Sequence, residues 1–179
     1  MVERKEMTRA ELHDLFVSEL HCEAWHPSTP ATMNEIVQME SELDTRLPAA
    51  YVAFMLVHGA VYTPDILDLI VDREVDMADL QNIEPIREAI AGTKACWSAG
   101  NPHDLLGIGG DSGGNMFCFK RYPANAERPD DLPVWFFDHE FVESYEVSPS
   151  FDQWLLSYIK LENPGINGDP TAKSAGGDA

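Results

Sequence analysis

The sequence predicts an α+β fold, in a single domain whose helices pack around a mostly antiparallel sheet. Three observations support this class. The first third of the chain repeats its apolar residues at helical spacing, residues 105–147 hold short apolar runs separated by turns, and helical spacing returns near the C-terminus. Helices followed by strands and a closing helix are typical of α+β proteins. The length of 179 residues suits one domain.

Three helices are expected before residue 60. Apolar residues at helical spacing predict the first over 8–22. A capping box of Thr32 and Glu35 starts the second, since each residue satisfies a free backbone N–H of the other. Pro48 suits the first position of the third helix, and Gly59 suits the position after its end. The N-terminal half is therefore predicted to be mostly helical.

The middle of the chain is expected to alternate between strand and helix. The run Ile66–Val71 is rich in Leu and β-branched residues and predicts a short strand. Residues 78–98 carry apolar residues at helical spacing and predict a helix, within which Pro85 is unfavourable. We expect the acidic residues around these two segments to lie at strand ends.

Residues 105–120 predict a β-hairpin, because two apolar runs flank the glycine-rich turn GGDSGGN. A polar loop over 121–131 follows, and short strands are expected at 134–137 and 144–147. Ser148 and Pro149 are expected to start the last helix, as its cap and first residue.

The domain boundaries follow from this order of elements. Beyond Glu162 the sequence has few apolar residues and is expected to be disordered. The expected organisation is an N-terminal helix and linker over 1–27, an α+β domain over 28–161 and a disordered tail over 162–179.

Composition restricts the function. Thirty-one Asp and Glu against 12 Lys and Arg give a net charge of −19, which disfavours nucleic acids and anionic membranes as partners. No apolar run is long enough to span a membrane, and the charged N-terminus lacks the features of a secretory signal. The three cysteines form no CxxC pair, so neither disulfides nor a zinc site is expected. We expect a cytoplasmic protein without a cofactor or metal.

The glycine-rich turn also supports an enzymatic alternative. Ser112 in Gly-Asp-Ser-Gly-Gly resembles the nucleophile of chymotrypsin-like proteases, but such a serine needs a histidine base oriented by an acid. No histidine before Ser112 lies in the sequence context of that family. His139, between Asp138 and Glu140, is a second candidate for acid–base or metal chemistry. A structural hairpin turn is favoured, and a hydrolase using Ser112 or His139 stays as the alternative.

Several short pieces of the chain, taken in order, resemble the SUKH superfamily. This superfamily includes bacterial toxin-immunity proteins and a fungal regulator of cell-wall synthesis. The matching pieces are Ile36, Glu40, Leu47-Pro48, Tyr51, Phe54, Gly59, Leu106–Gly109, Gly113–Asn115, Val134–Glu140 and Ser150–Leu155. The chain departs from the family at His58, where Asn usually precedes the glycine, and its acidic segment 65–88 has no close match.

The resemblance implies an α+β immunity protein that binds a cognate toxin, often a nuclease, and catalyses nothing. It supplies no binding residues, because family members diverge at the toxin-binding surface. A regulatory scaffold, as in the fungal branch, is a further alternative. Fold analogy alone is a weak basis for function.

The acidic residues themselves indicate a basic partner, because an enzyme that binds phosphates needs a cationic surface. Fifteen of the 31 acids lie within 65–88 and 127–146, where only three arginines accompany them. For any one of these acids, the simpler interpretation is that it belongs to a solvated surface and contributes only to solubility. The predicted toxin-binding residues are those expected to flank strands: Asp72, Glu74, Asp76, Asp79, Asp138 and Glu140. We expect the protein to be a monomer or a homodimer.

Overall fold

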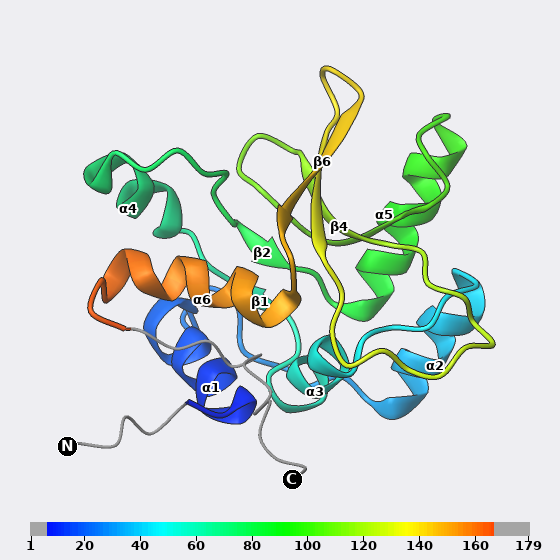
Figure 1. The fold of residues 1–179 in the computed structure, drawn as a ribbon, viewed down its shortest axis with the longest axis horizontal. Coiled ribbons are helices and arrows are strands. Elements are labelled where there is room, and N and C mark those ends of the chain that lie inside the picture. Colours follow the sequence, from blue (N-terminus) through cyan, green and yellow to red (C-terminus); the bar gives the residue numbers. More distant parts are fainter. Residues whose placement is uncertain (1–6, 167–179) are drawn as a thin grey trace, which may run out of the picture.

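A computed structural model describes residues 7–166. Within this range the chain forms six helices and six strands (Figure 1). The helices are α1 (Arg9–Leu20), α2 (Met33–Glu42), α3 (Ala49–Val57), α4 (Ile66–Arg73), α5 (Ile86–Ser98) and α6 (Phe151–Glu162). The strands are β1 (Val61–Tyr62), β2 (Asn82–Ile83), β3 (Leu105–Gly110), β4 (Met116–Lys120), β5 (Val134–Asp138) and β6 (Glu143–Ser148). The predicted α+β class is confirmed.

The strands form one antiparallel sheet in sequence order, β1 to β6. Alternate side chains along a strand point to opposite faces, so Phe117 and Phe119 of β4 share one face and are buried in the main core. There α3 and α6 meet them: the ring of Tyr51 lies 5.4 Å from that of Phe119, and the ring of Trp154 lies 4.9 Å from that of Phe117. The core therefore lies between the sheet and these helices.

Two further helices complete the packing. Helix α1 packs along α6, and its buried Leu12 and Phe16 belong to the same core as α6. Helix α5 packs on β3, where the Thr93 hydroxyl accepts a hydrogen bond of 2.9 Å from the Gly107 N–H. No helix within residues 7–166 is long and apolar enough to cross a membrane. The predicted domain boundaries stay predictions, and the predicted disordered tail lies outside the described residues from 167 onwards.

The predicted helix signals are confirmed where side-chain chemistry fixes them. Thr32 and Glu35 form the complete capping box at the start of α2, as Thr8 and Glu11 do at α1. Gly59 has φ of +70°, the left-handed conformation that glycine adopts without strain. A Cβ atom there would lie 1.9 Å from the Thr29 carbonyl oxygen, so only glycine fits.

The strand predicted for Ile66–Val71 is wrong, because this run lies within helix α4. Ile66 and Ile70 are four residues apart and both are buried, whereas Val71 is exposed. That is the burial pattern of one helical face. The β-branched composition misled the prediction because helical periodicity outweighs intrinsic strand preference here.

Three other boundaries also differ from the predictions. The helix predicted over 78–98 begins only at Ile86, because Pro85 occupies its N-cap, and the preceding segment supplies β2 between β1 and β3. The last helix begins at Phe151 instead of Pro149, since the Ser150 hydroxyl accepts from the Gln153 N–H. Similarly, Pro48 is the N-cap of α3, not its first residue.

Candidate functional site

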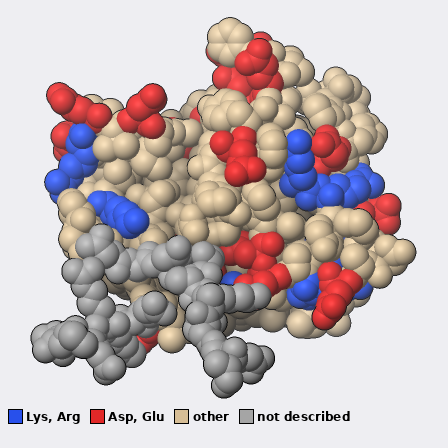
Figure 2. All heavy atoms as spheres, in the orientation of Figure 1, with Lys and Arg blue, Asp and Glu red and all other residues tan. Residues whose placement is uncertain are grey.

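A cleft runs along α6 between two projecting parts of the molecule. One wall is α4 with the segment that follows it, Glu74–Leu80, and the other wall is the β5–β6 hairpin (Figure 1). Two adjoining cavities, of about 490 and 310 Å³, share Met77 and Ser157 and form its floor. Figure 2 shows the surface notched between the two projections. We call this region the acidic cleft.

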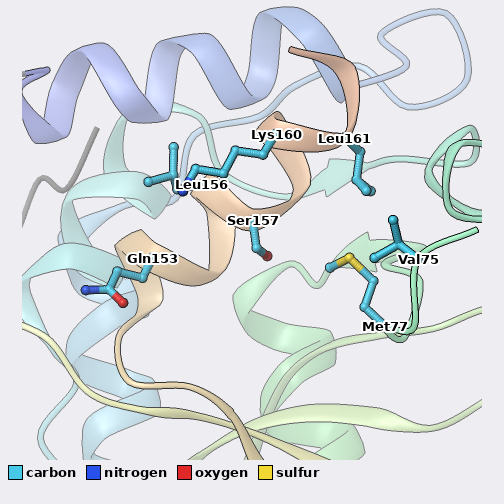
Figure 3. A pocket seen from close by; sticks show the side chains of 7 residues that line it. All are labelled: Val75, Met77, Gln153, Leu156, Ser157, Lys160 and Leu161. Carbon is cyan, nitrogen blue, oxygen red and sulfur yellow. The ribbon is translucent and has the colours of Figure 1, made fainter. Parts of the chain in front are cut away.

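The first wall is shaped by the end of α4. Glu74 has φ of +52°, and its backbone N–H bonds the carbonyls of Ile70 and Val71, which ends the helix. The chain then runs beside α6, where Val75 and Met77 line the larger cavity with α6 residues (Figure 3). Acidic and apolar side chains are mixed on this wall, together with one arginine. The exposed members are Leu67, Asp68, Val71, Asp72, Arg73, Glu74, Val75 and Asp76.

The second wall is the β5–β6 hairpin. The Asp138 carboxylate accepts hydrogen bonds from the N–H groups of Glu140 and Phe141, at 2.9 and 3.1 Å, and so shapes the turn. Phe141 is 73% exposed at the tip, beside the exposed Val142. Val142 has φ of +55°, a strained conformation for a β-branched residue. The turn therefore holds an aromatic side chain in solvent.

The glycine-rich β3–β4 turn joins the cleft through Asp79. One Asp79 carboxylate oxygen accepts from the Ser112 N–H at 3.1 Å, and the other accepts from the Ser112 hydroxyl at 3.2 Å. Within the turn, the Asp111 carboxylate accepts two hydrogen bonds from Asn115. The turn is thus fixed against the segment that follows α4.

Carboxylates from three parts of the chain act on two tyrosines of the cleft. Partial burial raises the pKa of Tyr145, and the negative charges of Asp138, Asp76 and Asp111 raise it further. Burial raises the pKa of Tyr158 much more strongly, with smaller contributions from Asp79 and Asp111. The negative charges of both walls and of the β3–β4 turn therefore act on the tyrosines of this cleft.

Most of the basic side chains that the structure describes lie outside the cleft and pair with carboxylates, but Arg73 on the first wall and Lys160 on the cleft floor pair with no carboxylate within residues 7–166. Arg46 and Arg128 bind Glu40, and Arg9 binds Asp152. Within residues 7–166 the other pairs between basic residues and carboxylates are Arg9–Asp130, Arg87–Glu35, Lys94–Glu42 and Arg121–Asp44. None of the six predicted binding residues forms an ion pair with Lys or Arg in that range. Both walls therefore carry more acidic than basic side chains; Figure 2 shows red spheres on both projections, with blue spheres beside them on the left one.

Of the six predicted residues, Asp76 alone lines one of the two cavities of the cleft. Asp76, Asp79 and Asp138 act on the cleft tyrosines. Asp72 and Glu74 lie at the end of α4, and Glu140 lies at the hairpin tip. Asp72 and Glu74 were predicted to flank a strand; they flank a helix end instead, because Ile66–Arg73 is helical.

Sequence reasoning missed the aromatic part of the site. Trp154 and Tyr158 belong to an apolar helical stripe that predicts core, and no local pattern shows that the cleft opens above them. Phe141 and Val142 did carry a signal, since an apolar pair within an acidic turn has no core to enter.

The residues of the hydrolase alternative have other partners. The Ser112 hydroxyl bonds the Asp79 carboxylate, and His139 uses its backbone N–H and ring Nδ1 to contact the Asn115 side-chain oxygen. A buried imidazole–carboxylate pair does occur, but it is His13 with Asp152, which ties α1 to α6. Among the described residues, no three His, Cys, Asp or Glu side chains are grouped to hold a metal ion.

The fold and the cleft define a small α+β protein with an acidic, apolar-walled binding surface. The sequence model of the SMI1 / KNR4 family (SUKH-1) matches residues 30–157, and the chain belongs to this family. The resemblance to the SUKH superfamily is confirmed. The match runs from just before α2 into α6, so it includes both walls of the cleft. No curated protein matches the chain. The family is regarded as one of non-enzymatic immunity domains, and membership is compatible with that role.

Proposed function

We propose that this chain is a non-enzymatic immunity protein that binds and neutralises a cognate bacterial toxin in the cytoplasm. The toxin is a protein with a cationic surface, of the nuclease type. One observation carries the proposal: both walls of one cleft expose acidic and apolar side chains together, and the acids outnumber the two basic residues of the cleft, Arg73 and Lys160. None of the six predicted acids pairs with Lys or Arg within residues 7–166.

The distribution of exposed apolar residues supports a protein partner. Eleven large hydrophobic side chains are exposed within the described residues, and seven of them lie on α4, the segment after it and the β5–β6 hairpin. The seven are Leu67, Val71, Val75, Phe141, Val142, Tyr145 and Val147. Contiguous exposed apolar surface marks interaction sites, and interfaces combine aromatic anchors with a polar rim.

The charge supports a cationic partner. A surface that binds nucleic-acid phosphates is rich in Lys and Arg, so a carboxylate-rich cleft is complementary to it. Complementary charge mainly accelerates association, by about 10- to 1,000-fold at low salt, whereas buried anchors slow dissociation. The two walls thus contribute differently: the acids guide encounter, and Phe141 and its apolar neighbours retain the partner.

The proposal predicts that a toxin domain is encoded beside this gene, and it is tested with a catalytically inactive form of that domain. Association is measured by biolayer interferometry on wild type and on a variant with Asp72→Lys, Glu74→Lys and Asp76→Lys. The control carries Glu88→Lys, Asp104→Lys and Glu127→Lys, which change net charge equally at exposed positions outside the cleft. We expect the on-rate of the cleft variant to fall about tenfold or more at low salt and to recover partly at high salt.

Two outcomes contradict the proposal. Equal on-rates for the cleft and control variants would show that only net charge matters. Protection that disappears in a Ser112→Ala variant which still binds the toxin normally would favour the hydrolase alternative. In cells, the active toxin should arrest growth unless this protein is co-expressed, and Ser112→Ala should protect as wild type does.

A further inference from the structure

We propose that the smaller cavity of the cleft binds an arginine side chain of the partner protein. This inference rests on the proposed function and specifies the chemistry of its central contact. The cavity has a volume of about 310 Å³ and lies where the β5–β6 hairpin, the segment after α4 and α6 meet. Its lining is aromatic on several sides and acidic at Asp76.

Aromatic rings form the floor and one side of this cavity. The Trp154 ring is 2% exposed and packs against the rings of Phe117 and Tyr158, with centroids at 4.9 and 5.7 Å. The Tyr145 ring is 51% exposed and packs against Phe136 on its other side. A planar cation gains from lying over such rings, and the guanidinium group stacks on them better than an ammonium group does.

One carboxylate lines the same cavity, and two more act on its tyrosine. Asp76 lines it, while Asp111 and Asp138 are close enough to raise the pKa of Tyr145. No Lys or Arg from the described residues lines this cavity. Guanidinium donates five N–H bonds in a flat fork, which suits several carboxylates arranged around an aromatic slot.

Trp154 supplies an observation that is independent of the charge. Its indole nitrogen is buried, lies towards the Tyr158 hydroxyl and makes no hydrogen bond of normal geometry among the described residues. The Tyr158 hydroxyl donates to the Ala78 carbonyl at 3.1 Å. The Trp154 indole N–H is thus directed at a residue that lines the same cavity, so its environment should report on occupancy of that cavity.

The larger, adjoining cavity contains a basic residue, which indicates where along the cleft the partner's arginine binds. Lys160 lines that larger cavity together with Leu156 and Leu161 (Figure 3). Its ammonium group disfavours a second cation there, so the arginine belongs at the Tyr145 end. The partner residue next along the cleft is then apolar or acidic.

The test uses short peptides as probes and the four tryptophan indole N–H signals as reporters. The full chain, labelled with ¹⁵N-tryptophan, is titrated with acetyl-Gly-Arg-Gly-amide, and with peptides in which lysine or citrulline replaces arginine. Citrulline has nearly the shape of arginine without its charge. We expect the Trp154 signal to shift saturably with arginine, about tenfold more weakly with lysine, and negligibly with citrulline.

Two exposed residues are varied to locate the site. Asp76→Asn and Tyr145→Ala should each weaken arginine-peptide binding about tenfold, because each removes one wall of the slot. Asp104→Asn, which changes an exposed acid outside the cleft, should leave binding unchanged. Equal shifts with citrulline, shifts confined to other tryptophans, or indifference to Asp76→Asn would overturn the inference.

The outcomes also separate this inference from the proposed function. If the toxin binds normally to Asp76→Asn and Tyr145→Ala, and the arginine peptide gives no saturable shift, the arginine site is wrong while the immunity function stands. If the arginine peptide binds as expected but charge reversal in the cleft leaves toxin binding equal to that of the control variant, the arginine site is real and the proposed function is wrong.

Discussion

Replacing Asp152 with alanine should destabilise the protein strongly, because this carboxylate joins α6 to α1. It is fully buried and accepts hydrogen bonds from Arg9 Nε at 2.7 Å and from His13 Nε2 at 2.8 Å. The alanine variant leaves two polar side chains without this partner, and His13 is itself buried. Breaking a buried ion pair costs about 3–5 kcal/mol, which corresponds to a fall in Tm of about 6–20 °C in a chain of this size.

Urea unfolding followed by tryptophan fluorescence measures this loss. Asp152→Asn keeps one carbonyl acceptor and should lose about half as much free energy of unfolding. Asp44→Asn, at an exposed pair with Arg121, should change stability by less than about 1 kcal/mol. A loss below about 1 kcal/mol for Asp152→Ala would refute the view that this network holds α1 on the core.

Three further predictions address the binding surface, a tight turn and acid stability. Phe141→Ala should leave the free energy of unfolding unchanged but raise the Kd for the toxin about 5- to 30-fold by calorimetry, because burying most of a phenylalanine contributes about 1–2 kcal/mol. Phe141→Leu should restore most of the affinity, and an unchanged Kd for the alanine variant would exclude the hairpin tip from the interface. Gly59→Ala should cost at least about 2 kcal/mol in urea unfolding, since its Cβ meets the Thr29 carbonyl at positive φ; a cost below about 1 kcal/mol would contradict that geometry. Hydrogen bonds from Thr32 lower the pKa of Glu35, so its carboxylate stabilises the fold above its ordinary pKa of 4.5 and this contribution is lost as pH falls through the lower folded value. Glu35→Gln should flatten the pH dependence of the urea midpoint in that acidic window, and an unchanged slope would argue against the capping-box interaction.

The parts of the fold that the sequence predicts correctly are those fixed by local chemistry. Thr32 with Glu35, and Gly59 after α3, act within a few residues, so their roles can be read without tertiary information. The strand prediction for Ile66–Val71 was wrong because the composition of these six residues favours a strand whereas their periodicity favours a helix. Packing of Ile66 and Ile70 against the core stabilises the helix. Strand β2 has only two residues and forms because it pairs with β1 and β3, so no local sequence pattern predicts it.

The candidate site likewise has features that are visible in the sequence and features that depend on tertiary structure. Acid density along the chain made Asp76, Asp79 and Asp138 candidates, because charge is visible in sequence, and their role in binding stays a prediction. Asp76 and Asp138 both act on Tyr145 because of where the antiparallel sheet places β6 relative to the segment after α4, which is a tertiary property. Trp154 looked like core and is buried; only the absence of covering atoms beside it turns it into the floor of a cavity.

Backbone strain gives an independent reason to regard the two walls as functional. Among the described residues other than glycine, three have positive φ, and two of them, Glu74 and Val142, stand at the turning points of the two walls. Such conformations cost about 1–3 kcal/mol each and concentrate at functional sites. Glycine at either position would remove the strain without loss of any core contact, because both side chains are exposed. Val142→Gly should therefore leave the fold at least as stable while allowing the tip to move, and so weaken toxin binding through loss of preorganisation. Binding that stays unchanged in a variant of normal stability would show that the strained tip is no part of the interface.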